Sequence, residues 1–247
     1  MRVNVIGRNN ELLHNYKGLN IMMSQIVENL LKQGIQFDDE GDPEKALEYF
    51  NKALKLDPLN IVLWTCKGLA HNEMNNYEEA IKCFNEVINI DSEYVYAFRY
   101  KGRTLFLVNQ YEEAIKSCDK AIEIGNTSAD PWMTKGYCFA SLNQSEKAIE
   151  CFNKALEIEP ENPGVWNDKG AYLAEIERYV EAIKCYEKAL NIDPYLAIVY
   201  YNKSNTEQKL GLRQEAIRSL EKFIVMAPPK YEFELKDARR RLSELTN

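Results

Sequence analysis

Two histidines and six cysteines are the residues of this 247-residue sequence that could do acid–base or nucleophilic chemistry. Such chemistry needs partner groups at fixed spacing. The sequence contains no G-x-x-x-x-G-K-[ST], G-x-S-x-G or H-E-x-x-H motif. His71 falls at a helix packing position derived below, so we expect it to pack and not to catalyse. We therefore predict a protein that is not an enzyme, without catalytic residues or a cofactor.

A metal site is the other chemistry that these residues could support. The cysteines form no C-x-x-C pair, so the spacing of a zinc site is missing. Cys83, Cys151 and Cys185 recur at one place in a repeat, and we expect reduced, half-buried packing residues. The acidic run 38–42 lacks the ligand order of a calcium loop and is followed by Pro43, which favours a solvated turn. We predict no metal site.

The overall charge and the chain start exclude several classes of protein. A net charge of -7 argues against binding to a nucleic-acid backbone, which needs a basic face. No stretch approaches the ~18 apolar residues of a membrane span, and the first residues do not resemble a secretory signal. We expect a cytoplasmic protein that binds neither nucleic acid nor membrane.

An eleven-residue segment recurs along the chain, as in AIKCFNEVINI from Ala80, AIECFNKALEI from Ala148 and AIKCYEKALNI from Ala182. Its leading alanine recurs every 34 residues, from Ala46 to Ala216. A fixed period of this length indicates a repeat architecture. The repeats are 27–60, 61–94, 95–128, 129–162, 163–196 and 197–230.

Conserved spacing inside each repeat predicts two helices. Positions 4, 8 and 11 share one face of a first helix, A, and positions 20, 24 and 27 share one face of a second, B. Glycine at 8 and alanine at 20 leave room for a close approach, and rings at 4 and 24 fill the space beside it. Asp42 and Asn76 are predicted helix caps, and proline near position 32 ends helix B. Such a hairpin buries its apolar face only by stacking on its neighbours.

This pattern resembles the tetratricopeptide repeat (TPR) family over residues 27–230. The resemblance implies an all-α fold: a right-handed superhelical α-solenoid of six stacked 34-residue helix-turn-helix repeats with terminal capping helices. One departure is lysine at position 7, where the family is commonly apolar, and we expect the lysine stems to cover apolar surface. Repeat 6 departs furthest, with Ser204 at position 8 and Glu207 at position 11.

The resemblance also implies a function, a non-catalytic protein–protein interaction scaffold. In the family, A-helix positions 2, 5, 9, 12 and 13 line a concave groove that typically holds a peptide or helical segment of a partner. Some TPR co-chaperones clamp a terminal carboxylate with lysine at position 5 and asparagine at position 9, followed by residues of later repeats. Here position 5 is never lysine, and Asn205 fills position 9 only in the final repeat, so the clamp is absent. The peptide-binding residues that we expect are Leu69, Asn72, Tyr96, Arg99, Arg103, Phe106, Met133, Tyr137, Asn167, Tyr201 and Asn205.

Rings and two arginines concentrate in the middle repeats of this predicted groove. Arg99 and Arg103 are four residues apart on one helix face and could grip a carboxylate. The alternative is that they pair with nearby acids such as Asp130 or Glu73, as exposed charges often do. The sequence does not identify the partner.

Both ends and one junction differ from the regular repeats. Residues 231–247 have an apolar stripe of Leu235, Ala238, Leu242 and Leu245, which predicts a capping helix with Arg239, Arg240 and Arg241 on its solvated face. In the segment 1–26 we expect a degenerate capping helix over 10–22, after loose residues 1–8. The junction 125–128 lacks proline, and position 24 of its repeat is Cys118 in place of a ring. We expect looser packing there.

Two other functions remain open. The array could self-associate into a homo-oligomer, with a terminus of its own or a neighbouring chain in the groove. It could also be a helical-repeat RNA binder or an enzyme, which the acidic charge and the missing catalytic groups disfavour.

Overall fold

The computed structural model describes the backbone of residues 4–246 and the side chains of residues 22–246. Every regular element in that part of the chain is a helix, which confirms the all-α prediction. The A helices are α1 (Asn4–Asp39), α3 (Ile61–Glu73), α5 (Val95–Leu107), α7 (Asp130–Ser141), α9 (Pro163–Glu175) and α11 (Ala197–Lys209). The B helices are α2 (Pro43–Leu56), α4 (Tyr77–Ile90), α6 (Tyr111–Ile124), α8 (Ser145–Ile158), α10 (Tyr179–Ile192) and α12 (Arg213–Met226). A 3-10 turn, η1 (Pro229–Tyr231), and α13 (Glu232–Thr246) follow.

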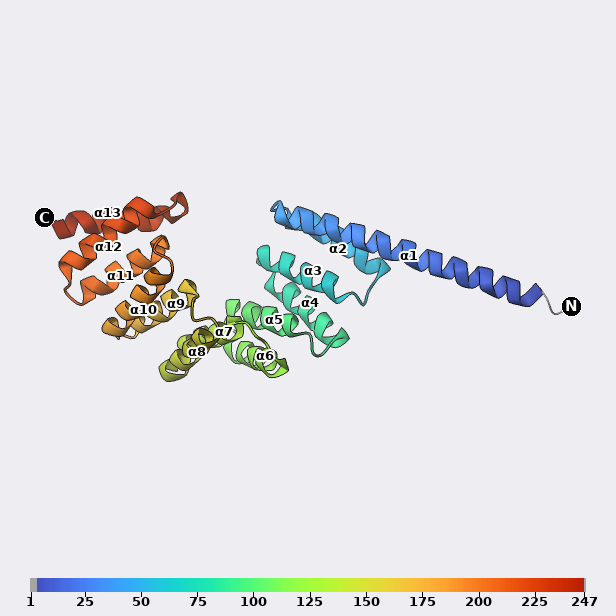
Figure 1. Ribbon diagram of the computed structural model, residues 1–247, viewed down its shortest axis with the longest axis horizontal. Helices are drawn as coiled ribbons and strands as arrows, with labels where there is room; N and C mark the ends of the chain where they lie inside the picture. The colour runs from blue at the N-terminus through green and yellow to red at the C-terminus, as the bar shows by residue number, and fades with distance from the viewer. Residues whose placement is uncertain (1–3, 247) are drawn as a thin grey trace. The chain divides into compact units, whose positions relative to one another are not determined.

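The helices form two compact units, Met1–Asn126 and Thr127–Asn247. Unit 1 stacks the hairpins α1–α2, α3–α4 and α5–α6, and unit 2 stacks α7–α8, α9–α10 and α11–α12 with α13 at its end (Figure 1). The boundary falls inside the segment 125–128. There α6 ends on Gly125, whose φ of 111° is left-handed. Looser packing at this junction stays a prediction that hydrogen exchange would test.

Each hairpin closes where the position-8 glycine of helix A meets the position-24 side chain of helix B. A Cβ placed on Gly34 would lie 2.4 Å from a ring carbon of Phe50, and one on Gly68 would lie 2.6 Å from Phe84. The alanine at position 20 is fully buried in all six repeats. The predicted close approach of the two helices is therefore confirmed.

Neighbouring repeats are joined by a hydrogen bond from the position-4 ring. The indole Nε1 of Trp64 donates to the carbonyl of Pro58, and that of Trp166 donates to the carbonyl of Pro160, both at 2.9 Å. The position-32 proline thus ends helix B and leaves its carbonyl for the next repeat's ring.

Three of the five position-7 lysines cover the tryptophan ring at position 4, as expected. The ammonium groups of Lys67, Lys135 and Lys169 lie 4.6 to 5.4 Å from the centroids of the tryptophan rings three residues earlier. Each lysine shields an apolar ring and gains a cation–π contact.

The turn from helix A to helix B uses a left-handed residue at position 15 of every repeat. The six residues are Gly41, Asn75, Asn109, Asn143, Glu177 and Gly211, with φ between 57° and 79°. Glycine and asparagine adopt this region at low cost, whereas other residues are strained there. Among the predicted caps, Asp42 accepts a hydrogen bond from the Lys45 amide at 3.1 Å. Asn76 stands at the N-cap of α4 but makes no side-chain cap bond, so that prediction was wrong.

Replacing Glu177 by asparagine should therefore stabilise unit 2. Glu177 is exposed and has a φ of 62°, so the change relieves backbone strain without disturbing packing. We expect a gain of about 0.5–1 kcal/mol in the free energy of unfolding, measured by urea denaturation. The matched change Asn143→Gly should alter stability little. An unchanged midpoint for Glu177→Asn would contradict the strain argument.

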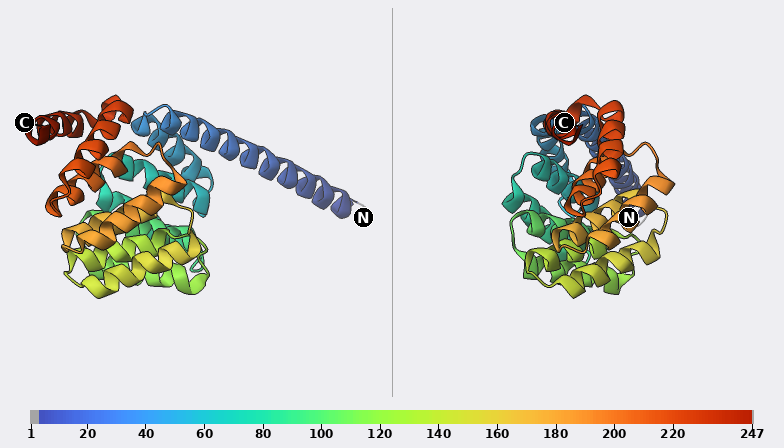
Figure 2. Two further views of the ribbon diagram at one scale, coloured as in Figure 1. Left: turned by 60° about the vertical axis from the view of Figure 1, so that its left-hand side comes forward. Right: turned by 90° about the vertical axis from the view of Figure 1, so that its left-hand side faces the viewer.

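The N-terminal segment differs from the expected separate cap. We expected a helix over 10–22 and loose residues before it, but α1 runs without a break from Asn4 to Asp39. It extends past the end of α2 (Figure 2). No proline and no glycine lies between Ile21 and Gln33, so nothing in the sequence ends the helix before repeat 1. Residues 1–3 lie outside the described part.

Candidate functional site

Positions 2, 5, 9, 12 and 13 of the A helices, which we call the A-helix wall, carry exposed apolar side chains in unit 1. These side chains are Ile35, Val62, Tyr96 and Leu107, with Tyr96 49% exposed. In α7, α9 and α11 no large hydrophobic side chain is exposed. An exposed apolar surface lined by rings marks an interaction site more often than an isolated exposed residue does. The A-helix walls of the two units therefore differ in character.

An aromatic and cationic cluster on α5 gives the unit 1 wall its shape. The rings of Tyr94 and Tyr96 lie 5.6 Å apart, and those of Tyr96 and Tyr100 lie 6.4 Å apart. The Arg99 guanidinium carbon lies 5.3 Å from the Tyr96 ring centroid and 5.7 Å from that of Tyr100. The rings thus hold Arg99 in place and limit its motion before any ligand arrives.

Arg103 lies one turn further along α5 and is exposed. The described residues include no ion-pair partner for it, and in particular it makes no ion pair with Glu73. The alternative that Glu73 neutralises this arginine is therefore wrong.

The remaining predicted residues of unit 1 lie deeper in the wall. Leu69, Asn72 and Phe106 are half-buried. The Asn72 amide donates to Thr104 Oγ1 at 2.8 Å, which ties α3 to α5. The Phe106 ring lies 5.9 Å from that of Tyr111. These three residues support the wall and offer it little free surface.

Asp38 stands at position 12 of repeat 1, as Asn72 does in repeat 2. It lacks the hydrogen-bond partner that Asn72 has in Thr104. Residue 70, which corresponds to Thr104, is alanine, and Asp38 Oδ1 is buried without a hydrogen bond. Burial first, and then the charges of Glu73 and Asp39, raise the pKa of the Asp38 carboxyl to about 6. The folded state holds this proton more tightly than the unfolded chain does.

Asp38→Asn should therefore stabilise the protein at neutral pH but not in acid. A raised carboxyl pKa makes the folded state lose stability as pH rises from about 4 to about 6, and the loss is complete above that range. Partial exposure of Asp38 limits the expected gain at pH 7 to about 1 kcal/mol. Urea denaturation at pH 4 and pH 7 tests this, with Glu86→Gln, at an exposed position on α4 that does not act on Asp38, as control. An equal gain at both pH values would exclude the proposed cause.

In unit 2, Tyr137 and Asn167 of the predicted wall bond to position-6 residues of the next A helix. The hydroxyl of Tyr137 donates to Asp168 on the neighbouring A helix, and burial raises the pKa of that carboxyl. The Asn202 amide donates to Asn167 Oδ1 at 3.0 Å. Met133 is half-buried and packs against a core cluster, and Asn205 is half-buried. These polar groups stabilise the stack of α7, α9 and α11.

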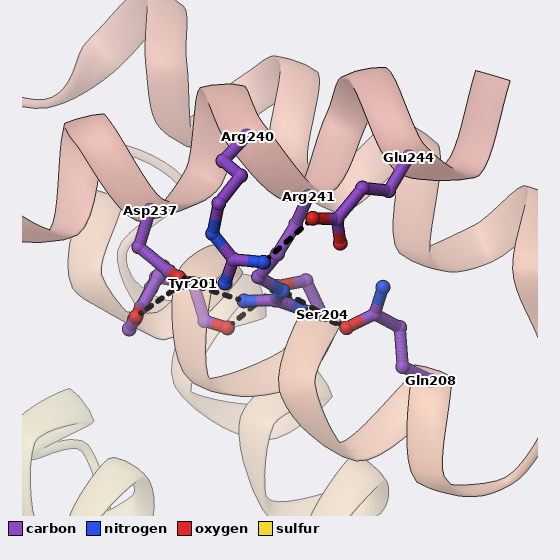
Figure 3. Close-up of polar contacts among 7 residues, drawn as sticks. All are labelled: Tyr201, Ser204, Gln208, Asp237, Arg240, Arg241 and Glu244. Atoms are coloured by element: carbon purple, nitrogen blue, oxygen red, sulfur yellow. Dashed lines mark hydrogen bonds and ion pairs between the residues drawn. The ribbon is translucent and has the colours of Figure 1, made fainter. Parts of the chain in front are cut away.

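Tyr201, Ser204 and Gln208 of α11 bond to the C-terminal helix α13 (Figure 3). The Tyr201 hydroxyl donates to Asp237 at 2.9 Å. Arg241 donates to Gln208 at 2.5 and 2.9 Å and to Ser204 Oγ at 3.1 Å. With 6% of its surface exposed, Arg241 corrects the prediction of a solvated arginine run. It follows Ala238 by three residues and so lies on the inward face of α13.

Ser204 and Glu207, which depart from the repeat pattern in repeat 6, both make polar contacts at this end of unit 2. Glu207 is buried, forms an ion pair with Lys203 at 2.6 Å, and accepts a hydrogen bond from Ser219 at 2.8 Å. Ser219 stands at position 23, where three other repeats have cysteine. The departures from the repeat pattern are therefore a paired polar cluster.

His71 and the six cysteines are packing residues, whereas the side chain of His14 lies outside the described part. Five of the six cysteines are buried and Cys66 is half-buried, so the expected half-burial is right for Cys66 alone. Burial raises the pKa of Cys83 to about 11, which suppresses its thiolate. His71 is half-buried, and burial lowers its pKa. Among residues with described side chains, no three His, Cys, Asp or Glu come together as a metal site would need.

No helix in the described part of the chain has both the length and the apolarity to cross a bilayer.

Comparison with protein families gave matches along most of the chain. Three family models described as tetratricopeptide repeat match residues 27–60, 61–94, 101–125, 129–162, 163–196 and 197–229. An uncharacterized protein of Methanocaldococcus jannaschii is 51% identical over 39 residues, which is 16% of this chain and 45% of the relative's own length.

Solved structures of similar fold share little sequence with this chain. PilW, described as a widely conserved type IV pilus biogenesis factor, matches with a TM-score of 0.77 and 19% identity, over 86% of this chain and 98% of PilW. YrrB, described as a TPR protein with an unusual peptide-binding site, matches with a TM-score of 0.55 and 22% identity, over 77% of this chain and 97% of YrrB. At these identities the likeness establishes the fold alone.

Proposed function

The chain belongs to the tetratricopeptide repeat family, and on that premise we propose that it is a non-catalytic scaffold that binds a segment of a partner protein on the A-helix wall of unit 1. The observation that carries the proposal is the exposed apolar surface beside Arg103. Aromatic and arginine side chains contribute most of the binding energy at protein interfaces. The peptide-binding site named for YrrB is consistent with this use of the fold.

The proposed site lies in unit 1 alone. Tyr96, Arg99 and Arg103 would contact the partner, with exposed Val62 beside them. In unit 2, Tyr137, Asn167 and Tyr201 already bond within the stack or to α13. Binding there would have to break these bonds, which costs free energy. We therefore assign partner binding to unit 1 and a structural role to the unit 2 residues.

Selection of displayed random peptides on the full chain tests this assignment. Selected peptides should bind Tyr96→Ala and Val62→Asp at least about tenfold more weakly than wild type, since each change removes exposed apolar surface. Lys116→Ala, an exposed residue on helix B of the same unit, serves as control and should leave the affinity unchanged. Binding that is insensitive to both wall variants, or a selection that yields no binder, would reject the proposed surface.

Self-association is the second candidate function. Beyond the end of α2, the helix α1 exposes Met22, Met23 and Ile26 within five residues. Exposed apolar side chains this close together are a common feature of subunit contacts. Light scattering over a range of concentrations decides the question, and a monomer at the highest concentration would exclude this function.

A further inference from the structure

We propose that the partner segment carries apolar side chains, an acidic side chain and a basic side chain. The apolar ones face Val62 and Tyr96 at repeat position 2, the acidic one faces Arg103 at position 9, and the basic one faces Asp39 and Glu73 at position 13. This inference rests on the proposed function, because it concerns the same A-helix wall of unit 1. It adds the charge pattern by which that wall would distinguish its partner from other apolar segments.

The acidic side of the wall lies at two helix ends. Asp39 is the last residue of α1 and Glu73 is the last residue of α3, both at wall position 13. The C-terminal end of a helix carries a partial negative charge, so a carboxylate there is unfavourable for stability and a cation is favoured. Leu107 occupies this position in the third repeat. Two successive carboxylates thus add to two helix dipoles and together attract a basic group.

Among the residues whose side chains the structure describes, these charges have no ion-pair partner. Asp39, Glu73 and Arg103 are all exposed, and none forms an ion pair with any residue whose side chain is described. Other exposed charges of unit 1 do pair with close neighbours, as in Lys32 with Glu28 and Lys82 with Glu79. The wall therefore presents two unneutralised carboxylates and an unneutralised guanidinium.

Apolar surface completes the pattern. Ile35 and Val62 are exposed on the first two A helices, and Tyr96 is exposed on the third, the helix that carries Arg103. Opposite charges on one surface favour a segment of complementary charge order and repel a segment with like charges in their place. A segment with an apolar part followed by one charge of each sign is the occupant that satisfies all of these groups.

Four synthetic twelve-residue peptides with leucine and phenylalanine at one end test the charge order. At two positions after this apolar part their charged residues are acidic then basic, basic then acidic, both acidic (two acidic ends), or both basic (two basic ends). Fluorescence anisotropy with the purified full chain should show that one mixed peptide binds about five- to tenfold tighter than either like-charged peptide. Arg103→Glu should shift the preference to the peptide with two basic ends, and Glu73→Lys should shift it to the peptide with two acidic ends.

The control is Lys116→Glu, which makes the same charge change on exposed helix B surface of unit 1. It should leave the preference unchanged. Equal binding of mixed and like-charged peptides, or an equal effect of Lys116→Glu and Arg103→Glu, would overturn the charge order. If none of the four peptides binds while displayed peptides bind through Tyr96 and Val62, the charge order falls and the proposed function stands. If displayed peptides also fail to depend on the wall, both fall.

Discussion

Replacing Gly68 by alanine should lower the free energy of unfolding of unit 1 by about 2 kcal/mol, although alanine is the better helix former. The added Cβ would lie 2.6 and 2.9 Å from two ring carbons of Phe84. That ring is fully buried and stacks 5.8 Å from the ring of Tyr100, so it has no room to move away. The clash therefore outweighs the gain of about 1 kcal/mol that Gly→Ala brings in an open helix.

A double-mutant cycle tests whether the Phe84 ring causes the loss of stability in Gly68→Ala. Phe84→Leu alone leaves a cavity and destabilises, but it also makes room for a side chain at position 8. Repeat 6 already combines Ser204 with Leu220 at these positions, both buried. The double variant should thus be more stable than the two single losses predict, as measured by urea denaturation. As control, Lys116→Ala should change stability little, because Lys116 is exposed on helix B of the same unit. Additive losses would contradict the steric explanation.

The sequence predicts the fold well because each hairpin is encoded locally and repeated. The 34-residue step predicts the helix pairs, and small residues at positions 8 and 20 predict where the two helices touch. Where the periodicity stops, the prediction fails. At the N-terminus we expected a separate capping helix over 10–22, but no residue there ends a helix, and α1 is continuous. The left-handed turns were not predicted, although glycine or asparagine at position 15 of five repeats would have indicated them.

The candidate site is predicted less completely, because position alone does not show whether a wall residue is free. Tyr96 and Tyr137 both lie on the predicted wall, but Tyr137 has Asp168 as a partner 31 residues along the chain, whereas Tyr96 is half exposed. Such a partner comes from the next repeat and varies between repeats. The difference between Asn72, which has Thr104, and Asp38, which has Ala70, arises in the same way. Whether a wall residue is free therefore depends on the residue at position 6 or 10 of the next repeat.

The contrast between the two units follows from these pairings. In unit 2, hydrogen bonds between successive A helices use the polar groups that would otherwise be offered to a ligand. In unit 1, several of the corresponding positions carry apolar or charged groups without such partners. Stability and recognition compete for the same side chains, and this chain assigns them to different repeats. The cap at the end of unit 2 is the clearest case of a wall position used for stability.

The packing of the capping helix α13 on α11 should depend on Arg241 and not on its neighbour Arg240. Arg241 is buried and donates hydrogen bonds to Gln208 and Ser204, so Arg241→Ala leaves buried acceptors unsatisfied and a cavity beside Tyr201. We expect a loss of about 2–4 kcal/mol in the free energy that holds α13 on α11. Hydrogen exchange should rise first in α13, because the cap contacts the last hairpin and little else.

Arg240→Ala is the matched control on the same helix. Arg240 makes two ion pairs, with Asp237 and Glu244, yet its side chain is 60% exposed (Figure 3). Exposed ion pairs add little to stability because water and salt screen them. Arg240→Ala should therefore leave exchange in α13 close to wild type at physiological salt. Equal protection losses for the two variants would mean that the surface ion pairs, and not the buried guanidinium, hold the cap in place.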